Sequence, residues 1–344
     1  MNDVIDSLTC HAPPFSLQAP ELEKKQQNIA KLMSFMPLHI LPPKLFRGLY
    51  TATDRLLGIR KIALPRVIDS TILLDVGASS DVSLKVRAYY PVFEGANVNQ
   101  SVKLKTLVYF HGGGCVIGSI NSHDRFCRYL AKHSNMNIIS VGYRLAPEHK
   151  FPVPLHDAIA AWNYIRQNHD KFAIDPEHIG VGGDSAGAYL ASIIGLRHLQ
   201  VDLPVSASAK PAFQFLLYPM FDLQGLTDSY HQFDKQLLLT RPLVDYFRKH
   251  YLNSLEQSPL PLVSPLQADD LSESPKSYIL TLGYDPLRDD GLAYVERLKS
   301  AKITVHHEHY DDSMHGFISV ASVSERAQKA VQDAALALHK FNDA

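Results

Sequence analysis

The chain has 344 residues, 46% of them hydrophobic, so it is long and apolar enough to build at least one large folded core. Its 34 Lys and Arg residues are balanced by 35 Asp and Glu residues, which gives a formal net charge of −1 at pH 7. Because this balance leaves no basic excess to bind a phosphate backbone, we expect no nucleic-acid partner.

The chain begins MNDVIDSLTCHAPP, which has neither a basic segment nor an apolar core, so we expect no secretory signal. No run approaches about 18 consecutive apolar residues, which predicts that there is no transmembrane segment. The cysteines Cys10, Cys115 and Cys127 cannot form a disulfide framework, and no CxxC pair suggests zinc. Free thiols fit a reducing compartment, so we predict a cytoplasmic protein without a metal site.

The first 60 or so residues look helical. Apolar residues at i, i+3, i+4 and i+7 predict an early helix with one apolar face, made of Ile29, Leu32, Met33 and Met36. Pro37 ends this helix, and a second one is expected through residues 45–49. The apolar face either packs on the core, which we favour, or partly covers a pocket. Residues 1–62 are assigned to an N-terminal helical cap segment.

From about residue 65, strands and helices alternate. A pair of strands is expected within 67–76 and 82–92, followed by strands at 104–110, 137–142, 178–182, 213–218, 277–283 and 303–310. Helices are expected at 122–134, 155–169, 186–199, 289–300 and 324–341. This alternation predicts an α/β fold with a mostly parallel sheet and helices on both faces. The core is assigned to 63–218 and 263–344.

Residues 219–262 interrupt the alternation, because they contain no convincing core strand. They include TRPLVDYFRKHYL, which predicts a helix with Thr240 as its cap and Pro242 in its first turn. We assign this insertion to a second cap segment. Its aromatic residues either wall off a pocket or only anchor the cap: Tyr246, Phe247 and Tyr251.

The stretch HIGVGGDSAGAYLA places a G-x-S-x-G motif, residues 183–187, between a strand and a helix. The flanking glycines permit a tight turn that holds the Ser185 hydroxyl above the sheet, where the helix from Ala186 also aims its first N–H groups. Taken alone, the motif also fits an ordinary glycine-rich turn. A serine becomes an effective nucleophile only beside a general base that a carboxylate orients.

Such a base and carboxylate are expected downstream, in the order serine, acid, histidine. Asp285 follows the end of a predicted strand, and His315 lies in the next strand-to-helix loop. Asp289 and Asp290 are rival acids, but their position at a helix start explains them as caps. Three further histidines lie within a strand, where surface or packing roles are expected: His306, His307 and His309.

A second glycine-rich stretch, HGGGCVIGS at 111–119, directly follows a strand. Glycine leaves its backbone N–H group open to a substrate. We therefore predict that the N–H groups of Gly112, Gly113 and Ala186 stabilise the oxyanion of a tetrahedral intermediate. His111 is expected to shape this loop. A phosphate-binding loop is excluded because no G-x-x-x-x-G-K-[ST] pattern follows.

Together these motifs resemble the hormone-sensitive-lipase-like branch of the α/β-hydrolase esterases. The resemblance runs from about residue 65 to the end and rests on HGGG at 111–114, YRLAPEHKFP at 143–152, GDSAG at 183–187, DPLRDDG at 285–291 and HGF at 315–317. It implies an eight-stranded sheet, a helical cap and cofactor-free hydrolysis of carboxylic esters through an acyl-serine. The roles it implies are nucleophile for Ser185, acid for Asp285, base for His315 and structural support for Arg144, Glu148 and Asp157.

Two positions depart from the family pattern. Cys115 follows the glycines where relatives often have an aromatic residue, and Ala188-Tyr189 replaces the usual Gly-Asn. We expect Cys115 and Tyr189 to line the substrate pocket. The short insertion predicts that acyl chains of short to medium length are preferred. An amidase and a non-catalytic ligand receptor are the alternatives, although the complete Ser, Asp and His set argues against the receptor. A homodimer is left open.

Overall fold

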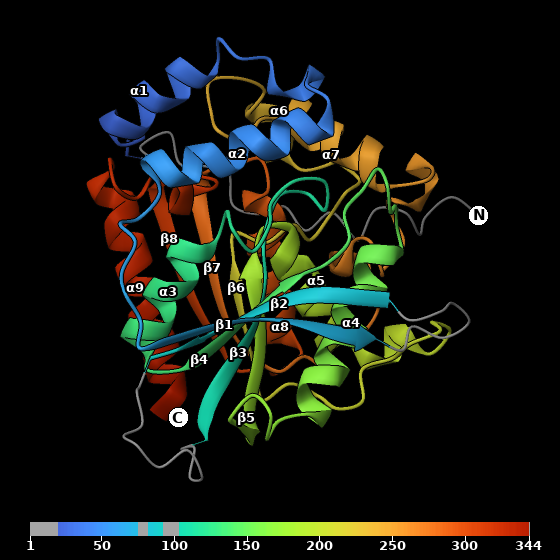
Figure 1. Ribbon diagram of the computed structural model, residues 1–344. Helices are drawn as coiled ribbons and strands as arrows, with labels where there is room; N and C mark the ends of the chain where they lie inside the picture. The colour runs from blue at the N-terminus through green and yellow to red at the C-terminus, as the bar shows by residue number, and fades with distance from the viewer. Residues whose placement is uncertain (1–19, 75–81, 92–102, 344) are drawn as a thin grey trace, which may run out of the picture.

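The computed structural model describes residues 20–74, 82–91 and 103–343. Its strands are β1 (Arg66–Leu74), β2 (Val82–Tyr90), β3 (Leu104–Phe110), β4 (Asn137–Gly142), β5 (Ile174–Asp184), β6 (Phe213–Leu217), β7 (Lys276–Tyr284) and β8 (Val305–Met314). They form one eight-stranded sheet in the order β1-β2-β4-β3-β5-β6-β7-β8 (Figure 1). β2 pairs antiparallel with β1 and β4, and the other neighbours pair in parallel. The predicted mostly parallel α/β fold is confirmed.

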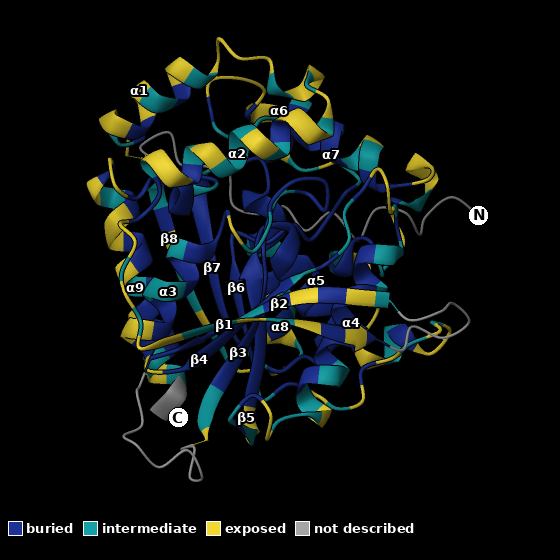
Figure 2. Ribbon diagram, in the orientation of Figure 1, coloured by how far each residue is buried: buried dark blue, intermediate teal, exposed yellow. Residues whose placement is uncertain are grey.

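Helices cover both faces of the sheet, as the alternation predicted (Figure 1). One face carries α3 (Asp124–Ser134) and α9 (Glu325–Asp343), and the other carries α4 (Val153–Gln167), α5 (Ala186–Gly195) and α8 (Arg288–Ser300). The central strands are buried between these layers (Figure 2). Short 3-10 helices lie between these elements: η2 (Arg197–Gln200), η3 (Leu255–Gln257), η4 (Pro265–Gln267) and η5 (Phe317–Val320). Within the described residues, no helix has the length and hydrophobicity needed to cross a bilayer.

A layer of helices lies over the carboxyl ends of the parallel strands (Figure 1). It consists of α1 (Lys24–Met33), η1 (Leu38–Ile40), α2 (Pro43–Leu57), α6 (Asp228–Gln232) and α7 (Arg241–Tyr251). Arg47 of α2 anchors this layer to the core, because its guanidinium donates to the Glu148 carboxylate at 2.7 Å and to the Ala146 carbonyl at 2.8 Å. The cap boundaries at 1–62 and 219–262 stay predictions, and residues 1–19 lie outside the described residues.

Two local expectations differ from the structure. The apolar face of the first helix meets both expectations in part, because Ile29 packs against the core and Met33 lines a cavity under the cap. Its other two residues do not pack on the core: Leu32 is 68% exposed and Met36 is 40% exposed. α1 buries only Gln26 and Ala30. β8 runs to Met314, beyond its predicted end at residue 310, because its ladder with β7 continues through the polar residues that follow. β8 is an edge strand, so one of its sides pairs with no other strand of the sheet and tolerates polar residues.

Asp54 of α2 is a buried carboxyl group, and its Oδ2 atom has no hydrogen-bond partner among the described residues. Burial raises its pKa from 3.8 to about 6. Since the unfolded chain releases this proton at a lower pH than the folded chain does, folding stability falls as the pH rises from about 4 to about 6 and stays lower above that range. A pKa difference of this size corresponds to roughly 2–3 kcal/mol.

We therefore expect Asp54→Asn to stabilise the protein at pH 8 by about 1–3 kcal/mol and to change its stability little at pH 4. Thermal unfolding of the variant and the wild type at both pH values measures this difference. An equal effect at the two pH values would show that the charge of Asp54 is not the cause.

Candidate active site

Ser185 lies at the turn between β5 and α5, above the carboxyl end of the sheet. Its backbone has φ 52° and ψ −117°, a strained conformation for a residue with a side chain. A Cβ atom on Gly183 would lie 2.3 Å from the carbonyl oxygen of Phe110, and one on Gly187 would lie 1.9 Å from it. Only glycine fits at these two positions, so the motif has the strand–turn–helix setting that the sequence predicted.

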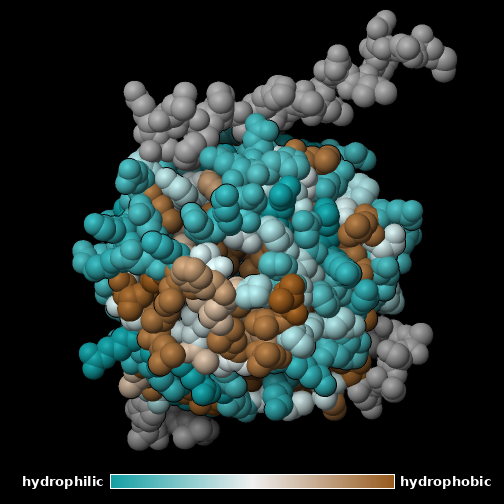
Figure 3. Space-filling view, turned by 90° about the horizontal axis from the view of Figure 1, so that it is seen from above, coloured by the Kyte–Doolittle hydropathy of each residue, from teal (hydrophilic) through white to brown (hydrophobic). Residues whose placement is uncertain are grey.

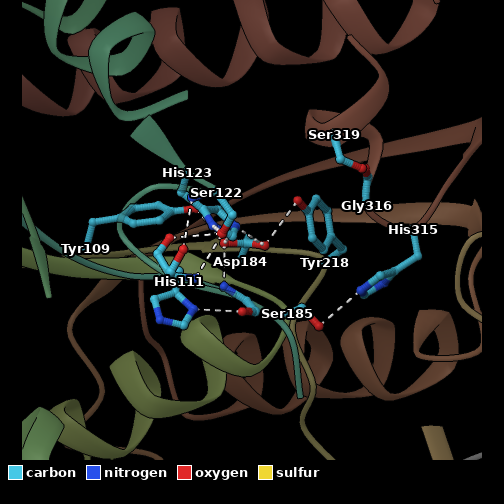
Figure 4. A network of polar contacts seen from close by, with 12 residues as sticks. Tyr109, His111, Ser122, His123, Asp184, Ser185, Tyr218, His315, Gly316 and Ser319 are labelled. Carbon is cyan, nitrogen blue, oxygen red and sulfur yellow. Dashed lines mark hydrogen bonds and ion pairs between the residues drawn. The ribbon is translucent and has the colours of Figure 1, made fainter. Parts of the chain in front are cut away.

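The structure brings Ser185, His315 and Asp285 together from three separate loops. His315 Nε2 lies 3.0 Å from Ser185 Oγ (Figure 4), and His315 Nδ1 lies 2.7 Å from Asp285 Oδ2. In the neutral imidazole, Nδ1–H donates to the carboxylate and Nε2 accepts the hydroxyl proton of the serine. All three residues are buried. This arrangement can activate the serine hydroxyl for attack on a carbonyl carbon.

The rival carboxylates have other partners. Asp289 accepts a hydrogen bond from Arg288 Nε at 2.7 Å, and burial raises the pKa of Asp290 well above its usual range. Neither contacts His315, whose carboxylate partner is Asp285. Three other histidines lie on β8, as expected: His306, His307 and His309.

In the glycine loop after β3, one of the predicted oxyanion donors has another role. The Gly112 N–H group donates to Asp184 Oδ1 at 2.9 Å, so the prediction that it serves a substrate is wrong. Gly113 and Gly114 line the same cavity as the serine and have φ of 110° and 60°, which glycine adopts without strain. Ala186 begins α5, where the first N–H groups have no partner within the helix. Gly113 and Gly114 thus lie in the cavity wall, and Ala186 directly follows the serine in the chain.

A cavity of about 90 Å³ opens beside Ser185. Its cap-side wall is mostly apolar, and the residues Tyr50 and Thr53 of α2 add two hydroxyl groups to it. The apolar residues come from both cap segments: Met33, Leu38, Phe46, Leu49, Leu238, Leu239, Leu243 and Phe247. Apolar side chains also gather on the outer face of the cap around a hollow (Figure 3). The exposed large apolar residues of the N-terminal segment include Leu32, Phe35 and Leu45. Such a cavity suits a hydrocarbon chain attached to a carbonyl group at the serine.

The aromatic residues of α7 divide between the two expected roles. Phe247 lines the cavity and so forms part of its wall. Tyr246 instead donates from its hydroxyl to the Leu41 carbonyl at 2.8 Å, which ties the two cap segments together. Tyr251 is fully buried, with its hydroxyl 3.0 Å from that of Tyr189.

The prediction that Cys115 and Tyr189 line the substrate pocket is wrong. Both side chains are fully buried, and neither lines the cavity beside the serine. The Tyr189 hydroxyl donates to the Leu262 carbonyl at 2.7 Å. Burial raises the pKa of the Cys115 thiol, which makes it a poor nucleophile. Cys115 follows the HGGG motif and Tyr189 follows the GDSAG motif closely in sequence, but neither side chain reaches the cavity.

The residues expected to act as supports have structural partners. Arg144 donates to the Asp157 carboxylate at 2.6 Å, and Glu148 binds Arg47 of the cap. Burial lowers the pKa of His111 to about 3, and its carbonyl accepts the Tyr143 hydroxyl at 2.7 Å, so this residue shapes the loop as predicted.

Sequence reasoning missed the polar cluster that lies beside the serine (Figure 4). Its centre, Asp184, lies inside the GDSAG motif, but no feature of the sequence pointed to its partners. In the part of the chain that the structure describes, no group of three or more His, Cys, Asp or Glu residues could hold a metal ion. Cys115 and Cys127 are free, buried thiols, and Cys10 lies outside the described residues.

Comparison with known proteins assigns the family. Residues 107–319 match a family model described as alpha/beta hydrolase fold. Carboxylic ester hydrolase LipN of Mycobacterium tuberculosis is 33% identical over 255 residues, which are 74% of this chain and 65% of LipN. Ethyl acetate hydrolase of Pseudomonas putida is 31% identical over 249 residues, which are 72% of this chain and 76% of that protein.

Among solved structures, an alpha/beta hydrolase enzyme from the metagenome of Lake Arreo, Spain, superposes with a TM-score of 0.83 at 33% identity. The match covers 94% of this chain and 99% of that one. The shared fold, the extent of these matches and the ester-hydrolase names of the relatives agree with one another. The chain belongs to the hormone-sensitive-lipase-like family of α/β-hydrolase-fold carboxylesterases.

Proposed function

We propose that this esterase cleaves esters of short to medium acyl chains through an acyl-serine intermediate on Ser185. The observation that carries this proposal is the hydrogen-bonded series from Asp285 through His315 to Ser185, which opens into an apolar cavity. Nucleophile, base and orienting carboxylate are the three groups that acyl transfer by a serine requires.

In the first half of the reaction, Ser185 Oγ attacks the ester carbonyl carbon while His315 Nε2 takes the hydroxyl proton. The resulting imidazolium is stabilised by the Asp285 carboxylate. The N–H groups of Gly113, Gly114 and Ala186 are the donors for the negative oxygen of the tetrahedral intermediate. Collapse of this intermediate breaks the bond to the alcohol oxygen, which receives its proton from His315.

In the second half, water replaces the alcohol. His315 removes a proton from the water, the hydroxide attacks the acyl carbon, and a second tetrahedral intermediate forms at the same donors. When it collapses, the proton returns from His315 to Ser185 Oγ and the carboxylic acid leaves. The cycle restores the free enzyme and consumes one water per ester.

Hydrolysis of p-nitrophenyl butanoate, measured beside the matching p-nitroanilide, tests the proposal against its two alternatives. We expect rapid turnover of the ester and little turnover of the anilide. Comparable rates on both substrates would favour an amidase. Binding of the ester without turnover would favour a receptor of the same fold.

The reaction should slow in acid, because His315 must be neutral to accept the serine proton. We expect kcat/KM to fall toward low pH with the dependence of a single proton. The measurement is a pH profile with p-nitrophenyl butanoate, corrected for any loss of folded protein. A profile that stays flat down to pH 4 would be inconsistent with a histidine base.

Acyl chain length should show an optimum between butanoate and octanoate. Each buried methylene contributes about 0.8 kcal/mol, so kcat/KM rises while the cavity has room and falls once the chain meets its end wall. Because Phe247 forms part of that wall, Phe247→Ala should move the optimum to longer chains. The measurement is kcat/KM for p-nitrophenyl esters from acetate to palmitate.

Phe233→Ala is the matched control, because Phe233 is equally buried in the same insertion but does not line this cavity. It should lower stability without moving the optimum. A steady rise through palmitate in the wild type, or sharp activation at a lipid–water interface, would contradict a closed acyl cavity.

A cytoplasmic location and a homodimer are kept as proposals from the sequence. Cell fractionation tests the first, and light scattering of the purified protein tests the second.

A further inference from the structure

Asp184, a buried carboxylate in the wall of the cavity beside Ser185, has no part in the reaction steps above; Tyr218 lines the same cavity. Asp184 is only 2% exposed. It accepts hydrogen bonds from the Tyr109 hydroxyl at 2.6 Å and from the Gly112 N–H group at 2.9 Å. The Tyr218 hydroxyl lies 3.4 Å from its Oδ2 atom, and His123 Nε2 lies 3.2 Å from its Oδ1 atom (Figure 4). These four groups surround one carboxylate and come from three segments of the chain: the end of β3 with its glycine loop, the start of α3, and the end of β6.

The Asp184 carboxylate and the His123 imidazole are both buried, and His123 Nε2 lies 3.2 Å from Asp184 Oδ1. Burial alone would raise the pKa of Asp184, but the opposing effect of His123, Tyr109 and the Gly112 N–H group lowers it. Burial alone would lower the pKa of His123, but Asp184 outweighs this and raises it. His123 Nδ1 lies 2.9 Å from the Ser122 hydroxyl, so both ring nitrogens of His123 have a polar partner. Hydrogen bonds to a charged acceptor are about twice as strong as those between neutral groups.

The partners of Asp184 belong to three parts of the catalytic machinery. Asp184 itself is bonded to Ser185 in the chain. Gly112 directly precedes the two glycines that line the cavity. Tyr218 follows β6 with a strained φ of 35°, and its ring packs edge-on against the ring of His315, with the ring centres 4.7 Å apart. One carboxylate therefore links the nucleophile turn, the glycine loop and, through a tyrosine, the base.

We propose that Asp184 is a positioning residue that fixes the glycine loop and, through Tyr218, the ring of His315 relative to Ser185. This inference rests on the proposed function, because it assumes that these groups stabilise a tetrahedral intermediate. Its physical basis is that donors must lie within tenths of an ångström of the developing oxyanion. A small displacement weakens transition-state binding far more than substrate binding.

Asp184→Asn and Tyr218→Phe test the proposal. Each removes one element of the link while nearly preserving side-chain volume. We expect Asp184→Asn to lower kcat about 10- to 100-fold with KM within twofold of the wild type, and Tyr218→Phe to lower kcat less, in the same direction. Affinity for a trifluoromethyl ketone, which forms a tetrahedral adduct with the serine, should fall in parallel with kcat.

Tyr278→Phe is the matched control. Tyr278 is a fully buried tyrosine of β7, and its hydroxyl donates to the Glu308 carboxylate at 2.9 Å. We expect the Tyr278→Phe variant to be less stable than the wild type but to keep its kcat and its affinity for the ketone. The proposal is overturned if Asp184→Asn keeps kcat and ketone affinity within twofold, or if Tyr278→Phe loses as much of both as Tyr218→Phe.

Should Asp184→Asn fail to fold, Tyr218→Phe decides the question alone: a parallel loss of kcat and ketone affinity supports the link, and unchanged values overturn it. Turnover of p-nitrophenyl butanoate by the wild type reports separately on the proposed function. An inactive wild type would refute the function, whereas an active wild type with unaffected variants would refute only the role of Asp184.

Discussion

Replacing Ser185 with alanine should lower kcat by about 10⁵- to 10⁶-fold, because the reaction then has no nucleophile to form the acyl intermediate. His315→Ala should have an effect of similar size, since serine and base act as one unit. The measurement is steady-state turnover of p-nitrophenyl butanoate, with circular dichroism to establish that both variants are folded.

Ser192→Ala provides the matched control. Ser192 is another buried serine, on the helix that Ser185 precedes, and its hydroxyl donates to the Tyr189 carbonyl at 2.7 Å. It should keep nearly full activity. If the Ser185 variant retained a substantial part of the wild-type rate, the nucleophile would have to be another residue.

Asp285→Asn should lower kcat by about 10⁴-fold. The carboxylate accepts a hydrogen bond from His315 Nδ1 and so keeps the free electron pair of the imidazole on Nε2, facing Ser185. An amide at this position can instead donate to Nδ1, which favours the tautomer that cannot accept the serine proton. KM should change much less than kcat, because the substrate does not contact this side chain.

Asp289→Asn separates the two acid candidates. Asp289 pairs with Arg288 and not with His315, so its replacement should reduce stability more than turnover. Kinetics and thermal unfolding of the two variants, measured side by side, make the comparison. If Asp289→Asn lost most of its kcat while Asp285→Asn kept nearly all of it, the orienting carboxylate would be Asp289 and not Asp285.

The sequence predicted the fold and the chain order of the site well, for physical reasons that are visible in the structure. Buried parallel strands must be apolar and alternate with helices, so this type of sheet can be recognised from the sequence pattern. The turn at Ser185 requires glycine at 183 and 187, where a Cβ atom would collide with the Phe110 carbonyl. The strand pattern and the G-x-S-x-G spacing are both visible within short stretches of the sequence, although the Phe110 carbonyl itself belongs to the neighbouring strand β3.

The site predictions that proved wrong concern groups whose orientation depends on residues far away in the sequence. The Gly112 N–H group is taken up by a hydrogen bond to Asp184, which lies 72 positions further along the chain. No residue near the HGGG motif indicates that this hydrogen bond forms. Cys115 and Tyr189 follow their motifs closely, yet the paths of the loop and of α5 turn both side chains into the core. The exposed Leu32 shows that helical apolar spacing does not reveal what the apolar face covers.

Covalent labelling identifies the nucleophilic residue of the enzyme. Diethyl p-nitrophenyl phosphate reacts with an activated serine hydroxyl and releases p-nitrophenol, and digestion followed by mass spectrometry locates the phosphoryl group. We expect one group per chain on Ser185, loss of esterase activity in proportion to labelling, and no comparable labelling of Ser185→Ala or His315→Ala. A label on another residue, or full activity in the fully labelled protein, would contradict an acyl-serine mechanism at Ser185.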